Sequence, residues 1–382
     1  MTNLKVPQFV FLGSDALEKA KAEIARLGNN ALIVTSPSMI KQGHVMSLIN
    51  ILESMDIKSA VYGEIKSEPT DNHVNQGLDI YRKNRCDFII AIGGGSPIDC
   101  AKAIGAMAVN EGDITVYNGS TFYKAIPPLV AIPSTGGTGS EATNRTIITD
   151  TGNNIKMLLK GDVLLPLIAV VDPKFSMQCP LNVTVATGLD ALTHAVEAYT
   201  SKKAFKESDE LAIKAIKRIF KNLPILLEDL SNENAREEMA LAAYEAGICI
   251  NNAAVTIVHG MSRPIGAYFH VPHGISNAML LEKCLSYVVD GGEERFAQLG
   301  KAIGLEERYD STRVLADKFI KAIGDFCSLC KVPSLDEYGI DKEEFFLVVD
   351  KMAQDAIDSG SPANTLKELT KEDILKVYKS LW

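Results

Sequence analysis

The sequence has no long apolar run and no basic run. No window of its 382 residues reaches the ~18 apolar residues that a membrane-spanning helix requires. Lys5 and Pro7 interrupt a short apolar stretch near the start, so no signal pattern appears there. The formal net charge is −9, without a sustained Lys/Arg run, which argues against nucleic acid or an anionic membrane as the main partner. We therefore expect a cytoplasmic protein that binds neither.

The number and spacing of the cysteines do not fit a disulfide framework. The seven cysteines are an odd number, scattered from Cys86 to Cys330, and are expected to be reduced thiols. Cys327 and Cys330 form a C-x-x-C pair, but no second pair accompanies it. We interpret these two as residues of a helix rather than as a zinc or redox site.

Standard nucleotide fingerprints are missing from the two glycine-rich loops. Neither Gly93–Asp99 nor Pro133–Glu141 matches G-x-G-x-x-G or the P-loop. Glycines nevertheless let backbone N–H groups approach an anion, and a helix start after the first loop would face a diphosphate. Ser96 suits the N-cap and Pro97 the first helical position. Each loop alone could be a plain turn, and a triple-glycine loop also occurs in some sugar and lipid kinases, so phosphoryl transfer from ATP is a rival.

Histidine is scarce, yet three of the six histidines lie in a pattern typical of metal ligands. Asp190 and His194 are four residues apart, so on a helix they face one side, one turn apart. His259 and His273 bound a segment in which Pro264 predicts a helix break. An isolated Asp-x-x-x-His pair is usually a solvated pair or a cap, and the second histidine segment is what favours a metal. Three imidazoles favour Fe²⁺, Zn²⁺ or another transition metal over the Mg²⁺ of a kinase.

The order of patterns predicts two domains. Up to about residue 180, β-branched runs alternate with helical patterns, as in a parallel sheet. The expected strands are 31–35, 59–62, 87–92, 129–132 and 167–171. Beyond Pro180 helical patterns take over, at 209–222, 232–249, 311–329 and 343–357. We predict an α/β, Rossmann-like dinucleotide-binding domain at 1–180 and an all-α metal-binding and catalytic domain at 181–382.

Taken together, these stretches resemble the iron-containing (group III) alcohol dehydrogenases from end to end. The matching segments are Gly93–Asp99 with Lys102, Pro133–Glu141, Asp190–Tyr199, His259–Met261 and Pro272–Gly274, with 69–70 and 147–150. The resemblance implies a two-domain fold like that of dehydroquinate synthase. It also implies an NAD or NADP site in the N-terminal domain and a metal ion held by Asp190, His194, His259 and His273.

The resemblance also assigns cofactor-binding residues. Gly94, Gly95 and Ser96 would hold the diphosphate, Thr135 and Thr138 would lie along the cofactor, and Lys156 would reach its ribose. Pro69, Gly93 and Asp99 are further candidates. The metal, Fe²⁺ or alternatively Zn²⁺ or another divalent ion, would act as a Lewis acid on the alcohol oxygen while nicotinamide takes the hydride.

The expected substrates are small primary alcohols, diols or hydroxy acids and their carbonyl partners. A glycerol-dehydrogenase-like or dehydroquinate-synthase-like enzyme is the alternative within the fold. An ATP-dependent kinase, or an interaction protein that has lost catalysis, is the alternative outside it. We expect a homodimer or higher homo-oligomer.

Arg263 departs from the family pattern. Many members carry a histidine here, thought to relay the proton, whereas arginine stays protonated near neutral pH. The relay would then run through His270, or would not be needed. Arg263 either favours substrates that bear a carboxylate or several hydroxyls, or it pairs with an acidic residue or caps a helix.

Ser36 is the second departure. It follows the strand at Ala31, where members that prefer NAD commonly place an acidic residue. Without that carboxylate a 2′-phosphate is not repelled, so we expect NADPH to be used at least comparably to NADH.

Overall fold

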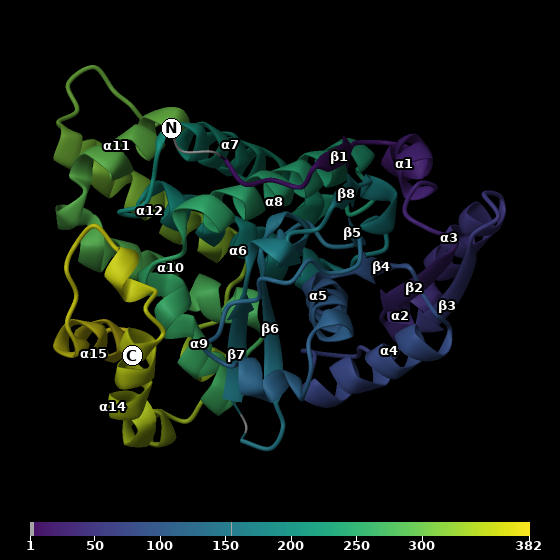
Figure 1. Ribbon diagram of the computed structural model, residues 1–382. Helices are drawn as coiled ribbons and strands as arrows, with labels where there is room; N and C mark the ends of the chain where they lie inside the picture. Colours follow the sequence, from purple (N-terminus) through teal and green to yellow (C-terminus); the bar gives the residue numbers. More distant parts are fainter. Residues whose placement is uncertain (1–3, 154) are drawn as a thin grey trace. The chain divides into compact units, whose positions relative to one another are not determined.

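The computed structural model describes residues 4–153 and 155–382, which divide into two compact units (Figure 1). The first unit spans Lys5–Cys179. The second spans Pro180–Trp382 together with Leu4. Within the described residues, every named strand belongs to the first unit, and the second is built of helices. The predicted fold class, an α/β unit followed by an all-α unit, is therefore confirmed.

A six-stranded parallel sheet forms the centre of the first unit. Its strand order is β1-β8-β5-β4-β2-β3. The strands are β1 (Phe9–Leu12), β2 (Asn30–Thr35), β3 (Lys58–Tyr62), β4 (Phe88–Gly93), β5 (Leu129–Pro133) and β8 (Ile168–Val171). Of the four inner strands, β4, β5 and β8 are buried along their whole length, which explains their continuous apolar sequences.

Helices cover both faces of this sheet. They are α1 (Ala16–Ile24), α2 (Pro37–Lys41), α3 (His44–Glu53), α4 (Asp71–Lys83) and α5 (Gly95–Val109), with the short 3₁₀ turns η1 (Ile114–Tyr117), η2 (Ser140–Ala142), η3 (Asp162–Leu164) and η4 (Pro173–Phe175). Successive residues of β2 point to opposite faces: Ile33 packs with α1 and α3, and Leu32 packs with α4 and α5. Each face of the sheet thus has its own apolar core.

Three strands of the first unit, β1, β6 and β7, were missing from the sequence prediction. β1 is a four-residue edge strand that pairs with β8 alone. β6 (Arg145–Asp150) and β7 (Ile155–Lys160) form an antiparallel hairpin. In β6 buried and half-exposed residues alternate, as expected of a strand with one covered face.

The second unit is an assembly of helices around one core. Its helices are α6 (Leu181–Tyr199), α7 (Lys206–Glu228), α8 (Glu233–Ala253), α9 (Ile257–Phe269), α10 (His273–Val288), α11 (Glu293–Ala302), α12 (Thr312–Leu329), α13 (Leu335–Tyr338), α14 (Lys342–Asp358) and α15 (Lys371–Lys379), with the turns η5 (Val289–Gly291) and η6 (Pro362–Asn364). A Cβ on Gly274 would lie 2.2 Å from the carbonyl oxygen of Ala186. Glycine at this position therefore lets the start of α10 contact α6 directly.

The helix break predicted at Pro264 is wrong. α9 runs through Pro264, which is buried. A proline inside a helix frees carbonyl groups one turn earlier. Here the carbonyl of Met261 accepts a hydrogen bond from Tyr378 Oη at 2.6 Å, and that of Ser262 accepts one from Ser276 Oγ at 2.9 Å. Residues distant in the sequence thus hydrogen-bond to this turn of α9, which a local sequence pattern cannot reveal.

No single helix in the described ranges is both long and apolar enough for a membrane span. α8 and α9 meet the length and composition criteria only as a pair, and they are bent by 104° relative to each other.

Candidate metal centre and cofactor loops

Helix α6 brings Asp190 and His194 to one buried face. The two side chains are one turn apart, as the sequence spacing predicts, and His194 Nε2 lies 3.7 Å from Asp190 Oδ1. Asp190 is 4% exposed and His194 is 5% exposed. A carboxylate buried to this extent needs a cation or several hydrogen bonds to remain charged.

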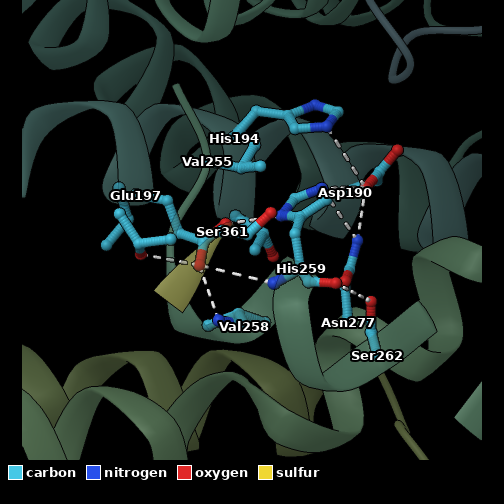
Figure 2. Close-up of polar contacts among 12 residues, drawn as sticks. Asp190, His194, Glu197, Val255, Val258, His259, Ser262, Asn277 and Ser361 are labelled. Carbon is cyan, nitrogen blue, oxygen red and sulfur yellow. Dashed lines mark hydrogen bonds and ion pairs between the residues drawn. The ribbon is translucent and has the colours of Figure 1, made fainter. Parts of the chain in front are cut away.

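The fold adds His259 and His273 to this pair, and Figure 2 shows His259 together with Asp190 and His194. His259 comes from α9 and His273 is the first residue of α10. Their Nε2 atoms lie 3.6 Å and 3.8 Å from Asp190 Oδ1. The His259 ring stacks on His194 at 4.6 Å and meets His273 edge-on at 5.2 Å. Three helices therefore direct four candidate ligands toward one place.

The spacing of these donor atoms suits a metal ion. Tetrahedral ligands at about 2.1 Å from one ion lie roughly 3.4 Å from each other. The three imidazole nitrogens lie 3.6–3.8 Å from the carboxylate oxygen, and Asp190, His259 and His273 offer ligand atoms all within 4.8 Å of one another. A carboxylate with imidazoles is a donor set for Fe²⁺, Zn²⁺ and similar ions. The residues present therefore fit the implied metal.

Glu197 fixes the orientation of His259. Its Oε2 lies 2.5 Å from His259 Nδ1, and because a carboxylate only accepts, Nδ1 is the donor. Glu197 is fully buried, and its Oε1 accepts hydrogen bonds from Thr256 Oγ1 at 2.8 Å and the Val258 amide at 2.6 Å. With Nδ1 held in this way, Nε2 of His259 is left to face Asp190. This is the carboxylate–histidine arrangement that supports metal ligands.

Asn277 occupies the middle of the cluster. It lies on α10 one turn after His273 and is fully buried. Its Nδ2 donates to Asp190 Oδ1 at 2.8 Å and lies 3.2 Å and 3.3 Å from Nε2 of His259 and His273. Its Oδ1 is buried and has no hydrogen-bond partner among the described residues. One amide therefore contacts three of the four candidate ligands.

Charge within the cluster sets the protonation of its members. Burial raises the pKa of Asp190, but the neighbouring histidines outweigh burial, and the net pKa lies well below the usual range. Burial likewise raises the pKa of Glu197, and His259 reverses the shift to a net decrease. Burial lowers the pKa of His273 to about 3, against the opposing effect of Asp190. Near neutral pH the two carboxylates are thus charged and His273 is neutral, as metal binding requires.

The other two catalytic candidates are not among the four converging donors. Arg263 is on α9, four residues after His259, and its Nη1 donates to Ser361 Oγ at 3.1 Å. Burial lowers the pKa of Arg263, and Glu197 opposes this. His270 is the exposed C-cap residue of α9, with φ at 55°. An ion pair of Arg263 with an acidic residue, which was one of the alternatives for this side chain, is not found among the described residues.

In the first unit the two glycine-rich loops lie against each other. A Cβ on Gly94 would lie 3.5 Å from Thr135 Cγ2, and one on Gly95 would lie 3.0 Å from Thr138 Cγ2. Gly93 has a φ of 151°, a conformation that favours glycine. The predicted N-cap at Ser96 is wrong: Gly94 is the N-cap, and Gly95 and Ser96 are the first residues of α5. Helix α5 therefore begins at Gly95, directly after the glycine turn. The amides of its first turn have no carbonyl partner within the helix.

A buried ion cluster joins the second loop to α5. Lys102, fully buried on α5, donates to the carbonyls of Ser140, Thr143 and Arg145 at 2.7–2.9 Å. Asp99 Oδ2 accepts from the Ile147 amide at 2.9 Å, so this carboxylate contacts β6. Burial lowers the pKa of Lys102 to about 8.

The remaining cofactor candidates lie near the ends of strands or on the hairpin. Ser36 is the N-cap of α2, and its Oγ lies 2.8 Å from Ser38 Oγ. The carbonyl of Pro69 accepts from the Thr149 amide at 2.9 Å. Lys156, on β7, is exposed and pairs with the Glu68 carboxylate at 2.7 Å.

Glu197 and Asn277 were not identified as site residues from the sequence. Glu197 lies three residues after His194 on the same predicted helix, so helical periodicity could have placed it beside the ligands. Asn277 lies four residues after His273, but the sequence offered no reason to relate an amide there to Asp190. That relation arises from the packing of α10 on α6.

Both units match family models. Residues 7–173 match the model described as iron-containing alcohol dehydrogenase, and residues 184–382 match its C-terminal counterpart. The chain is 35% identical to the 1,3-propanediol dehydrogenase of Citrobacter freundii, over 99% of this chain and 98% of the relative. It is 32% identical to the NAD-dependent methanol dehydrogenase of Bacillus methanolicus, with full coverage of both chains.

Solved structures show the same similarity. A crystal structure of 1,3-propanediol oxidoreductase superposes with a TM-score of 0.96 at 34% identity and covers all of both chains. The two family matches leave little of the chain unassigned and favour the dehydrogenase over the kinase alternative. The chain belongs to the iron-containing alcohol dehydrogenase family and is an oxidoreductase of alcohols and carbonyl compounds.

Proposed function

We propose that this chain transfers a hydride between a nicotinamide dinucleotide and a small primary alcohol, diol or hydroxy acid, or the corresponding carbonyl compound. The observation that carries the proposal is the convergence of Asp190, His194, His259 and His273 on one place in a buried helical core. The names of the relatives support primary alcohols and diols as the substrate class and NAD as a cofactor.

The four side chains would hold the metal, with Fe²⁺ as the first candidate and Zn²⁺ or another divalent ion as the alternative. When bound, the ion supplies Lewis acidity toward the substrate oxygen. Glu197 keeps Nδ1 of His259 protonated and Nε2 available. His273, whose side chain is 39% exposed, is the member of the cluster that a substrate can approach. Arg263 and His270 are the further residues that we assign to the substrate side.

The first unit would bind the cofactor. The free amides of Gly95 and Ser96 at the start of α5, next to Gly93 and Gly94, suit a diphosphate. The hydroxyls of Thr135 and Thr138 border the same glycines, and Thr135 Oγ1 has no hydrogen-bond partner among the described residues. Pro69, Asp99 and Lys156 complete the proposed set. Accordingly, 1–180 is the proposed dinucleotide-binding domain and 181–382 the proposed metal-binding domain, in a homo-oligomer located in the cytoplasm.

Ser36 makes the choice between NADH and NADPH testable. Its uncharged hydroxyl at the start of α2 does not repel a 2′-phosphate. We expect the protein to use NADPH at least comparably to NADH, and Ser36→Asp to shift the ratio of kcat/KM toward NADH. Steady-state rates with both cofactors check this, and a protein that already ignores NADPH would contradict the role given to this position.

The function as a whole is tested by one pair of measurements on anaerobically purified protein. Elemental analysis should find about one divalent transition metal per chain, and NADH or NADPH should be oxidised in the presence of small aldehydes. A metal-loaded protein that oxidises neither cofactor with any aldehyde would refute the proposal.

A further inference from the structure

We propose that Arg263 and Ser361 form a subsite for an anionic substituent, so that the enzyme prefers aldehydes and alcohols bearing a terminal carboxylate. The inference rests on the proposed function, because it names the substrate class of the same site.

Arg263 lies next to the metal centre by its place on α9. It follows His259 by four residues, so the two side chains leave the same face of the helix, with Cβ atoms about 6 Å apart. Gly260 brings α9 against η6 at this turn, because a Cβ there would lie 2.8 Å from Pro362 and 3.5 Å from the Ser361 Cβ. Ser361, which is 5% exposed and labelled in Figure 2, is thereby fixed beside the guanidinium.

The guanidinium has far more donors than partners. Arginine carries five N–H groups, and the contact found for Arg263 within the described ranges is the single hydrogen bond to Ser361 Oγ at 3.1 Å. No carboxylate in these ranges lies within 4.0 Å of its nitrogens. The side chain is nevertheless only partly exposed. Removing a cation from water without an ionic partner costs free energy. An anion bound beside the guanidinium would offset that cost.

The acidic residues of the centre are already occupied. Asp190 faces the three imidazoles, and Glu197 is bound by His259, Thr256 and the Val258 amide. Their two negative charges balance the charge of one divalent ion. The positive charge of Arg263 is then left over, and a carboxylate on the substrate would neutralise it.

The chemistry of the two side chains suits a carboxylate. A guanidinium binds carboxylate oxygens through two parallel N–H groups. Because Ser361 Oγ accepts from Arg263, its own hydroxyl hydrogen can be donated to a bound oxyanion. A neutral alkyl end of a substrate would instead leave these donors unsatisfied.

The test compares matched aldehydes on the metal-loaded protein with its nicotinamide cofactor. Three- and four-carbon aldehydes with a terminal carboxylate are each assayed against the aldehyde with a methyl group in its place. We expect kcat/KM to favour the acids about tenfold or more. Arg263→Met should reduce that preference by a similar factor, Arg263→Lys should reduce it in part, and Ser361→Ala by less. Arg313→Met, at an exposed arginine on α12, is the control and should leave the preference unchanged.

A second readout does not depend on turnover. Calorimetric titration with succinate, an unreactive dicarboxylate, should show binding to the wild type that is weakened about tenfold or more in Arg263→Met and by less in Arg263→Lys. A wild type that reduces both kinds of aldehyde equally well, or a preference that survives in both arginine variants, overturns the subsite while leaving the proposed function intact. A metal-loaded wild type that reduces neither kind of aldehyde overturns the proposed function and the subsite together.

Discussion

At the scale of single residues, the strength of the metal centre depends on side chains that do not themselves face the ion. Glu197 is the clearest case, because its carboxylate holds the ring of His259 through Nδ1. Outer partners of this kind contribute to metal affinity by fixing the tautomer and direction of a ligand.

We predict that Glu197→Gln lowers the affinity for the bound divalent metal about 10–100-fold. The amide is neutral and cannot stabilise the orientation of His259 as a carboxylate does. Competition with a chelator of known affinity measures the change. Glu238→Gln, at a carboxylate on the same unit that pairs with Arg218, is the matched control and should leave the affinity unchanged. Equal affinities of wild type and Glu197→Gln would show that Glu197 has no part in the metal centre.

Asn277 gives a different prediction, because its amide nitrogen contacts the ligand atoms of Asp190, His259 and His273. In the metal-free protein it holds these acceptors together, and a metal ion would take over that role. Asn277→Leu should therefore destabilise the metal-free protein by about 1–3 kcal/mol and the metal-loaded protein by less. Urea unfolding with and without metal measures both. The same loss in both forms would be evidence against this role.

Residue-scale prediction from the sequence succeeded where the chemistry is local. Asp190 and His194 share a helix face because of their spacing alone. His259 and His273 lie on different helices, and their approach depends on contacts such as Gly274 against Ala186. No spacing rule encodes that approach, so the sequence could offer these two histidines as candidate ligands but could not show how they reach Asp190.

At the scale of elements, buried hydrogen bonds connect α5 to the segment that follows β5. Lys102 ties the loop to the helix with buried hydrogen bonds. Glu141 lies in the same loop with 1% exposure, and its Oε2 has no hydrogen-bond partner in the part of the chain that the structure describes. Burial raises the pKa of Glu141 from 4.5 to about 7, with Lys102 opposing.

This shift has a defined effect on stability. Between about pH 4.5 and pH 7 the folded chain keeps a proton on Glu141 that the unfolded chain has lost, so the contribution of this group to stability falls as the pH rises. Glu141→Gln removes the titration. Relative to wild type, the variant should gain up to about 3 kcal/mol of unfolding free energy from about pH 5 to about pH 7.5. Urea unfolding of both proteins across that pH range checks this prediction. A difference in unfolding free energy that does not change with pH would contradict the raised pKa of the buried Glu141 carboxyl.

The sequence-based prediction of helices and strands failed where tertiary contacts determine the secondary structure. β1 is a short edge strand that pairs with β8, and α9 continues through Pro264, with Tyr378 and Ser276 donating hydrogen bonds to carbonyls of the preceding turn. The long helices and the buried central strands were predictable, since their periodicity is carried by many residues. The hairpin of β6 and β7 depends on packing against α5, which its sequence does not indicate.

At the scale of the whole molecule, the two proposed binding sites belong to different units. The proposed metal ligands all belong to the second unit, and the glycine-rich loops all belong to the first. Metal binding and nucleotide binding should therefore be separable by mutation.

His194→Ala should abolish metal retention and turnover while the affinity for NADH stays within about threefold of wild type, because three ligands cannot close a four-ligand site. Elemental analysis and nucleotide fluorescence titration measure the two properties on one sample. Loss of NADH binding together with the metal would indicate that the tasks are not divided in this way.

The most direct test of the central claim is anomalous X-ray diffraction from crystals of the metal-loaded protein, recorded at the absorption edge of the metal. The account predicts one strong peak within about 2.0–2.4 Å of an Asp190 carboxylate oxygen and of Nε2 of His194, His259 and His273. A peak elsewhere in a catalytically active crystal, or full activity without any metal, would contradict it.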